Sequence, residues 1–216
     1  MRIRAYTLTV HVGHAPCWMY DKDRGCEILS LANCKPMIRQ AAHENAGKNT
    51  GEWIAGVTPT RMGLRLAYLM RVTKAIPRST YWARYKESRF DSIYKPNGDS
   101  GWIPLENPWH TDEESFARDL SSDWVLLSTE FYVFANSYSE HDKTPHGLHL
   151  VPEYCALARG GMQGPGHFIE VPDSFLSWIK EQPRLKMSEF RVLRNFRADG
   201  CGCCKEEEPA CLEKCD

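Results

Sequence analysis

Alternating apolar and polar positions at the start of the chain predict a β-strand over residues 3–12. In this segment Tyr6, Leu8 and Val10 fall on one side, and β-branched residues are frequent. A short apolar segment, CEILSLA, predicts a second strand, and EWIAGV and LRLAYLMRVT predict two more around the turn TPTRMG. The strongest β pattern is SDWVLLSTEFYVFA, which is long enough for one bent strand or for two strands.

Helical spacing is confined to short segments. Pro36 suits a first helical turn, and Met37, Ile38 and Ala42 belong to an apolar stripe that follows it. STYWARYKE and VPDSFLSWIKEQ predict two further short helices, whereas the Pro, Gly and Asn of residues 88–111 predict a long irregular loop. Because strands dominate and the order is mixed, we expect an α+β domain around a strongly bent sheet.

The length of 216 residues predicts one domain, which we place at residues 1–197, followed by a Cys- and Glu-rich tail at 198–216. The first residues, MRIRAYTLTVHVG, have no apolar signal-peptide region, and no apolar run is long enough to cross a bilayer. We therefore expect a cytoplasmic protein without a membrane partner. In that compartment the nine cysteines are better interpreted as thiols or metal ligands than as disulfides.

Charge is unevenly divided along the chain although the net charge is only −1. Residues 1–100 contain 16 Lys and Arg against 8 Asp and Glu, and the remainder contains 11 against 20. Such asymmetry is consistent with a surface that faces a polyanion. It is equally consistent with basic and acidic segments that neutralise each other within one domain.

The junction ANCKPMIR brings a thiol and two cations to the start of a helix. Unpaired N–H groups at a helix N-terminus attract anions, so Lys35 and Arg39 are candidate ligands for a phosphate or an acidic substituent, with Arg65 as a further basic candidate. Cys34 is a candidate nucleophile, because a nearby helix start and a lysine favour the thiolate. A solvated helix face and a packed thiol explain the same residues.

Aromatic residues in loops and at helix ends are candidates for stacking on a base. Trp18, Trp82 and Trp102 are the strongest of these, since each stack contributes about 1–3 kcal/mol in complexes with unpaired bases. Packing in the core of a bent sheet is the alternative for any one of them.

Two histidines have catalytic potential. His110, in NPWHTDEESF, could act as a general base beside a carboxylate or as a metal ligand, although the segment also has the composition of a helix start capped by Thr111. His167 follows the glycine-rich RGGMQGPG, which lacks the Gly-Lys-Ser/Thr ending of a phosphate-binding loop.

The tail contains five thiols within fifteen residues. A tetrahedral zinc ion could take four of them, although the spacing is not that of a zinc finger or ribbon. A reduced acidic tail or a redox-sensitive appendage are the alternatives. The candidate zinc ligands are Cys201, Cys203, Cys204, Cys211 and Cys215.

Several of these motifs together resemble the nucleotide modification associated domain family, second type. The similarity covers most of residues 3–182 and is carried by LANCKPMIRQAA, GEWIAGV, LRLAYLMRVTKAIPRSTYWARYKESRF and SDWVLLSTEFYVFA. The resemblance implies a domain that occurs in phages and bacteria near enzymes of DNA base hypermodification. The middle of the chain also resembles the PUA, EVE and YTH group of β-barrels, with Glu52 in place of the usual Asp, and this implies a PUA-like pseudo-barrel.

Three hypotheses of function follow. The first is a binding module for a nucleotide or for modified DNA, with a base stacked on aromatics and phosphate held by basic residues. The second is an enzyme that modifies or processes a nucleotide or DNA base through His110, His167 or Cys34. The third is a phage or host protein-interaction module. No acid–base pair is readable from the sequence, so the residues by themselves favour binding.

Overall fold

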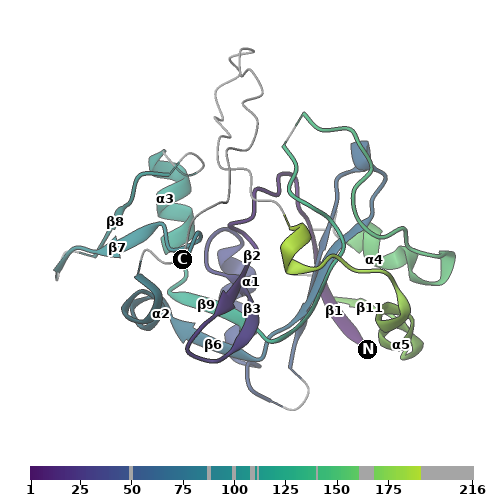
Figure 1. The fold of residues 1–216 in the computed structure, drawn as a ribbon, viewed down its shortest axis with the longest axis horizontal. Coiled ribbons are helices and arrows are strands. Elements are labelled where there is room, and N and C mark those ends of the chain that lie inside the picture. The colour runs from purple at the N-terminus through teal and green to yellow at the C-terminus, as the bar shows by residue number, and fades with distance from the viewer. Residues whose placement is uncertain are drawn as a thin grey trace, which may run out of the picture.

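Two β-sheets lie side by side in the computed structural model, with helices around them (Figure 1). The structure describes residues 1–48, 51–86, 89–98, 101–107, 110, 112–139, 141–160 and 168–190. Its strands are β1 (Arg2–Thr7), β2 (Cys17–Asp21), β3 (Cys26–Leu31), β4 (Trp53–Val57), β5 (Leu66–Arg71), β6 (Lys74–Pro77), β7 (Tyr94–Pro96), β8 (Trp102–Pro104), β9 (Trp124–Ser128), β10 (Glu130–Val133) and β11 (Phe168–Glu170).

The helices are short. The α-helices are α1 (Pro36–His43), α2 (Arg78–Tyr85), α3 (Glu113–Leu120), α4 (Cys155–Gly160) and α5 (Ser174–Glu181), and 3₁₀ turns occupy Thr60–Met62, Pro152–Tyr154 and Met187–Glu189.

Strands that are close in sequence are divided between the two sheets. The larger sheet has the order β10-β5-β4-β1-β11, in which β1 and β4 are parallel and the other pairs antiparallel. The smaller sheet has the antiparallel order β2-β3-β9-β6, and β7 and β8 form a separate hairpin. Because β9 and β10 belong to different sheets, the segment SDWVLLSTEFYVFA crosses from one sheet to the other at Thr129.

Both sheets are buried on two faces, and alternate side chains along a strand belong to different cores. In β1, Tyr6 joins the central core between the sheets, whereas Ile3 and Ala5 join the core under α4 and α5. In β9, Leu126 points to the central core, and its neighbours point to the core under α2. Helix α1 packs on β9 and β6 and adds Ile38 to the central core.

The predicted α+β class is confirmed, whereas the described strands form no closed barrel. The predicted helices over α1, α2 and α5 are present, and the strong β pattern forms two strands. The sequence did not predict β2 or β6, and it placed β7 and β8 in an irregular loop. These strands have only three to five residues each, which is too short for alternation to identify them.

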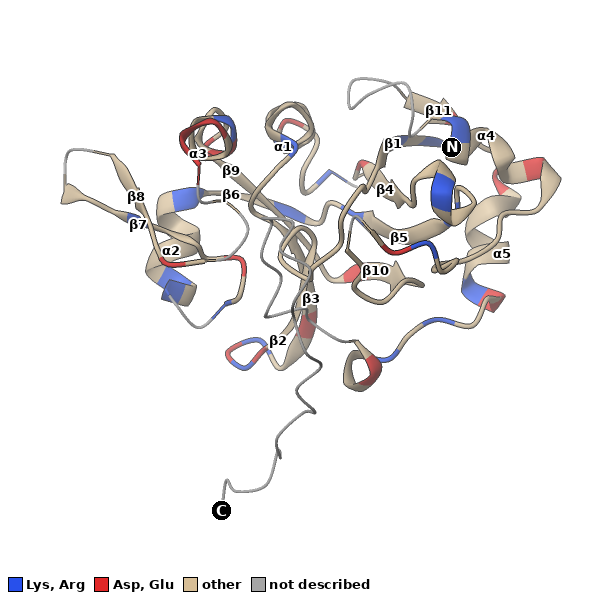
Figure 2. Ribbon diagram, turned by 90° about the horizontal axis from the view of Figure 1, so that it is seen from above, with Lys and Arg blue, Asp and Glu red and all other residues tan. Residues whose placement is uncertain are grey.

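The basic and acidic parts of the chain are interleaved in space. Strand β1 pairs with β11, β3 with β9, and β5 with β10, so each sheet combines N-terminal and C-terminal segments. Figure 2 accordingly shows Lys, Arg, Asp and Glu distributed over the elements of both sheets. This arrangement favours mutual neutralisation over one large basic surface.

Within the described ranges, every helix is too short or too polar to cross a bilayer.

A buried histidine in the central core predicts acid sensitivity. The ring of His11 is 1% exposed and lies against Tyr138 and Phe190. Burial lowers the pKa of His11 to about 4 from an ordinary value of 6.5, so the unfolded chain binds the proton more tightly. The free energy of unfolding therefore falls as the pH drops from 6.5 to 4, by about 1.4 kcal/mol per pH unit for this one group.

Urea unfolding of the wild type and of His11→Phe across this pH range tests the effect. The variant should lose about 3 kcal/mol less than the wild type between the two limits. Identical pH profiles for the two proteins would contradict it.

Candidate thiol and histidine site

Cys34 sits in a strained turn between β3 and α1. Its φ is 57° and that of Lys35 is 45°, both in the left-handed region that non-glycine residues seldom occupy. Two hydrogen bonds hold the turn: the Cys34 N–H donates to Asp119 Oδ1 at 2.6 Å, and the Cys34 carbonyl accepts from Arg39 Nε at 2.9 Å. Cys34 as a residue is partly exposed and also packs against the central core.

Asp119 connects this turn to a histidine. It lies in the last turn of α3. The start of this helix is capped by Asp112, whose Oδ1 accepts a hydrogen bond from Ser115 N at 2.8 Å. The Asp119 side chain is fully buried, and besides Cys34 N it accepts from the Tyr94 hydroxyl at 2.8 Å and from His110 Nδ1. His110 Nδ1 therefore carries a proton, and its Nε2 faces away from the carboxylate.

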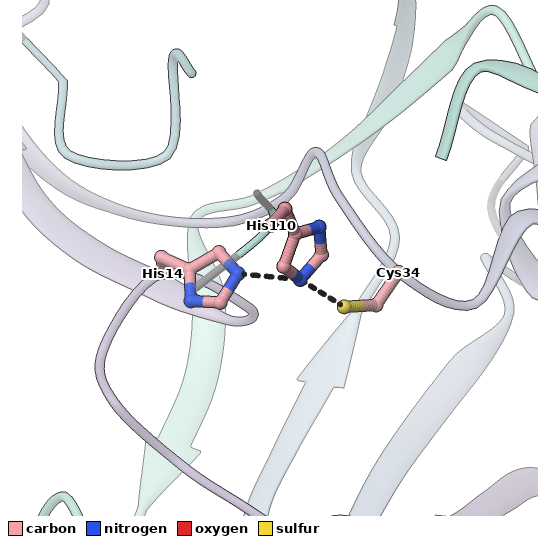
Figure 3. A group of neighbouring side chains, drawn as sticks. All are labelled: His14, Cys34 and His110. Atoms are coloured by element: carbon pink, nitrogen blue, oxygen red, sulfur yellow. Dashed lines mark hydrogen bonds between the residues drawn. The ribbon is translucent and has the colours of Figure 1, made fainter. Parts of the chain in front are cut away.

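Two reactive side chains, Cys34 and His14, meet the His110 ring at the nitrogen that faces away from Asp119. Cys34 Sγ is 3.4 Å from His110 Nε2, and His14 Nε2 is 3.3 Å from the same atom. Figure 3 shows the three side chains pointing toward one another. Together with Asp119 they form a continuous chain from thiol to imidazole to carboxylate.

The pKa values of the two imidazoles, His110 and His14, are shifted in opposite directions. Burial alone lowers the pKa of His110, but its hydrogen bonds to Asp119 and Cys34 outweigh burial and raise that pKa to about 10. Burial, reinforced by the charge of His110, lowers the pKa of His14 to about 3. Burial raises the pKa of Asp119, but the bonds from His110 and Tyr94 are stronger and hold it below its ordinary value.

Two buried arginines form the framework below the site. Arg39 is fully buried, and besides Cys34 its guanidinium donates to the carbonyls of Ser122, Trp124 and Asp119 at 2.5–2.9 Å. Arg78 donates to the same Asp119 carbonyl at 3.1 Å. The structure thus places Arg39 in the framework instead of at an anion-binding surface.

Lys35 and Trp102 remain beside the site. The Lys35 ammonium lies over the Tyr6 ring, 4.7 Å from its centroid, and it interacts electrostatically with Cys34. Burial lowers the pKa of Lys35. Arg78 lies between two aromatic rings, 5.4 Å from the Tyr94 centroid and 6.0 Å from that of Trp102, so Trp102 is connected to the site through Arg78.

Other candidates lie apart from this group. Trp18 is buried against Phe131, and its indole N–H donates to Glu27 at 3.2 Å beside a separate groove of about 400 Å³. Trp82 is half-buried on α2, and Arg65 is at the start of β5, where it donates to the Gly147 carbonyl at 3.5 Å.

Several sequence candidates lie outside the described residues. They are Thr111, His167 and the tail cysteines Cys201, Cys203, Cys204, Cys211 and Cys215.

The sequence missed His14, Tyr94 and Asp119 as members of the site. His14 was in a loop with no neighbouring motif, and Asp119 is 85 residues from Cys34 and was part of an ordinary helix pattern. The one local signal is the spacing of His110 and Asp119, which are nine residues apart and join across the start of α3.

The fold and site define an α+β domain with a thiol–imidazole–carboxylate group at the junction of strand and helix. The model of the family described as nucleotide modification associated domain 2 matches residues 1–187, and the chain belongs to this family. The expectation drawn from the sequence motifs is thereby confirmed. Comparison with curated proteins and with solved structures gave no match.

The framework role of Arg39 predicts a loss of stability on its removal. Arg39→Met removes one donor from each of four main-chain carbonyls, although the Asp119 carbonyl retains its bond from Arg78. The free energy of unfolding should therefore fall by roughly 3–5 kcal/mol in urea titrations. Met37→Ala on the same helix is the control, because Met37 is 66% exposed and its change should stay within about 0.5 kcal/mol. An Arg39→Met protein of normal stability that binds nucleotide poorly would contradict this role.

Proposed function

We propose that the protein is a thiol-dependent enzyme that acts on a nucleotide or nucleobase derivative. Cys34 is the nucleophile, His110 holds the proton of the Cys34–His110 pair and returns it to the leaving group, and Asp119 orients His110. The observation that carries the proposal is the 3.4 Å contact of Cys34 Sγ with His110 Nε2, whose opposite nitrogen is bound to a buried carboxylate. A nucleophile in reach of a base that is itself held by a third group is the arrangement that covalent catalysis requires.

Acyl transfer is the reaction class that this group serves best. Because the raised pKa of His110 favours the imidazolium, the proton shared by Cys34 Sγ and His110 Nε2 lies on His110 when the sulfur attacks the carbonyl carbon of an amide or ester. The carbon–nitrogen or carbon–oxygen bond breaks as His110 returns the proton to the leaving amine or alcohol, which leaves a thioester on Cys34. Water or an amine then attacks the thioester, His110 accepts its proton, and the thiol is regenerated.

The local geometry supports this role for Cys34. Left-handed backbone at a non-glycine residue costs about 1–3 kcal/mol and persists where surrounding contacts enforce it. Here the enforcing contact is Asp119, the same residue that orients His110. The position of the sulfur and the orientation of the base are therefore fixed by one group.

Family membership supports a nucleotide as the substrate class, and two neighbouring residues suit it. Lys35 provides a positive charge next to Cys34 for a phosphate. Trp102, half-buried on β8, provides an aromatic face for a base. A binding module would use the same two residues, but it would have no need of Cys34 and His110 in contact.

Alkylation tests the nucleophile. Iodoacetamide should modify Cys34 faster than Cys17, Cys26 or Cys155 in peptide-mapped mass spectra. His110→Gln should slow that modification at least tenfold, because it removes the imidazolium that holds the proton of the pair and favours the thiolate nucleophile. Cys26→Ser is the matched control and should leave labelling of Cys34 unchanged. Cys26 is partly exposed, as Cys34 is, but it lies at the start of β3 and is not part of the histidine group.

Nucleoside monophosphates acylated on the exocyclic amine provide the turnover probe. An intact-mass increase equal to the acyl group should appear on the wild type and be absent from Cys34→Ala. Equal labelling of His110→Gln and wild type, with no acyl adduct on either, would refute the thiol mechanism.

Phosphate recognition by Lys35 is tested separately. Lys35→Gln should weaken binding of a nucleoside monophosphate about tenfold, equivalent to about 1.4 kcal/mol, while binding of the matching nucleoside is little changed. Trp102→Ala should weaken both ligands to a similar extent. Lys48→Gln is the control, because Lys48 is exposed and hydrogen-bonds to Asn45. It follows the C-terminal end of α1, whereas Cys34 precedes the start of that helix. Equal loss of nucleotide and nucleoside in Lys35→Gln would contradict a phosphate contact.

A further inference from the structure

His14 belongs to the site but has no role in the proposed thiol mechanism. Its ring is 5% exposed, and its Nε2 points at His110 Nε2 (Figure 3). Asp119 is bound to the other ring nitrogen of His110, Nδ1. His110 Nε2 has a single in-plane position for a hydrogen bond, and both Cys34 Sγ and His14 Nε2 approach it. The two contacts therefore converge on one nitrogen atom.

These three atoms are arranged so that one metal ion could bind all of them. The two imidazole nitrogens and the sulfur lie within 4.8 Å of one another. Tetrahedral zinc, with Zn–N distances of about 2.0–2.1 Å and Zn–S of about 2.3 Å, separates two nitrogen ligands by about 3.3 Å and a nitrogen from a sulfur by about 3.6 Å. The observed separations of 3.3 Å and 3.4 Å are close to these values.

The surroundings also suit a metal ligand set. Metal-bound histidines commonly donate their second N–H to a carboxylate, which fixes the ring, and His110 makes this contact with Asp119. Both histidines are more than nine-tenths buried, whereas Cys34 is partly exposed. Three protein ligands and an accessible side leave a fourth position for water or another ligand.

We propose that His14, Cys34 and His110 form a mononuclear site for a borderline-soft divalent cation such as Zn²⁺, and that the bound ion blocks the thiol. Binding displaces the proton shared by Cys34 Sγ and His110 Nε2, which is released to solvent. Metal capture stands on the three-ligand geometry alone, while its inhibitory effect rests on the proposed thiol function.

Cobalt substitution tests metal capture directly. The full chain should be used with its tail cysteines changed to Ser, so that they cannot contribute ligands; these are Cys201, Cys203, Cys204, Cys211 and Cys215. One equivalent of Co²⁺ should produce a sulfur-to-cobalt charge-transfer band and the intense visible bands of a tetrahedral ion. One equivalent of Zn²⁺ should remove both.

His14→Gln in the same background is the decisive variant. It should lower the affinity for Co²⁺ at least 100-fold, because one of three ligands is lost. The matched control is His43→Gln, since His43 is partly exposed on α1 and stacks on Trp124 instead of facing Cys34. Absence of the charge-transfer band in the tail-substituted protein, or a band of the same affinity in His14→Gln, would overturn the metal site.

Protection of the thiol provides the second readout. The ratio of Cys34 alkylation rates without and with Zn²⁺ should exceed ten in the tail-substituted protein and fall to near one in His14→Gln. A cobalt band with no enhanced reactivity of metal-free Cys34 would leave the metal site standing and remove the thiol enzyme. Enhanced reactivity of Cys34 that Zn²⁺ does not suppress would leave the thiol enzyme standing and remove the metal site.

Discussion

The buried carboxylate of Asp119 is the group on which the site and its framework depend. Its two oxygens accept hydrogen bonds from Cys34 N, His110 Nδ1 and Tyr94, and its main-chain carbonyl accepts from Arg39 and Arg78. A buried charge of this kind is tolerated because it is fully hydrogen-bonded. The position of the nucleophile and the orientation of the base are thus consequences of the same electrostatic requirement.

The sequence predicted the local parts of this arrangement and not their assembly. Pro36 and the apolar stripe after it located α1, and the ANCKPMIR junction located the cysteine at its start. The sequence also predicted that Lys35 and Arg39 are both candidate anion ligands at this helix start. The left-handed backbone at Lys35 ends the helical geometry there, so Lys35 remains near the surface while Arg39 turns inward.

The rest of the site could not be predicted because it is built by tertiary contacts. His14 comes from a loop before β2, His110 from the segment before α3, and Asp119 from the end of α3. Periodicity reports which face of an element is apolar, but it does not report which elements meet. The same limit explains why strong β signals were recognised and their division between two sheets was not: each sheet is buried on both faces.

The separation of these residues along the chain has a consequence for biosynthesis. Cys34 and Asp119 are 85 residues apart, and the hydrogen bond between them fixes the strained turn. A nascent chain that has emerged only through α1 contains Cys34 and His14 without His110 or Asp119. Such a chain carries an ordinary thiol, and the reactive arrangement appears only after translation has passed α3 and β9 has paired with β3.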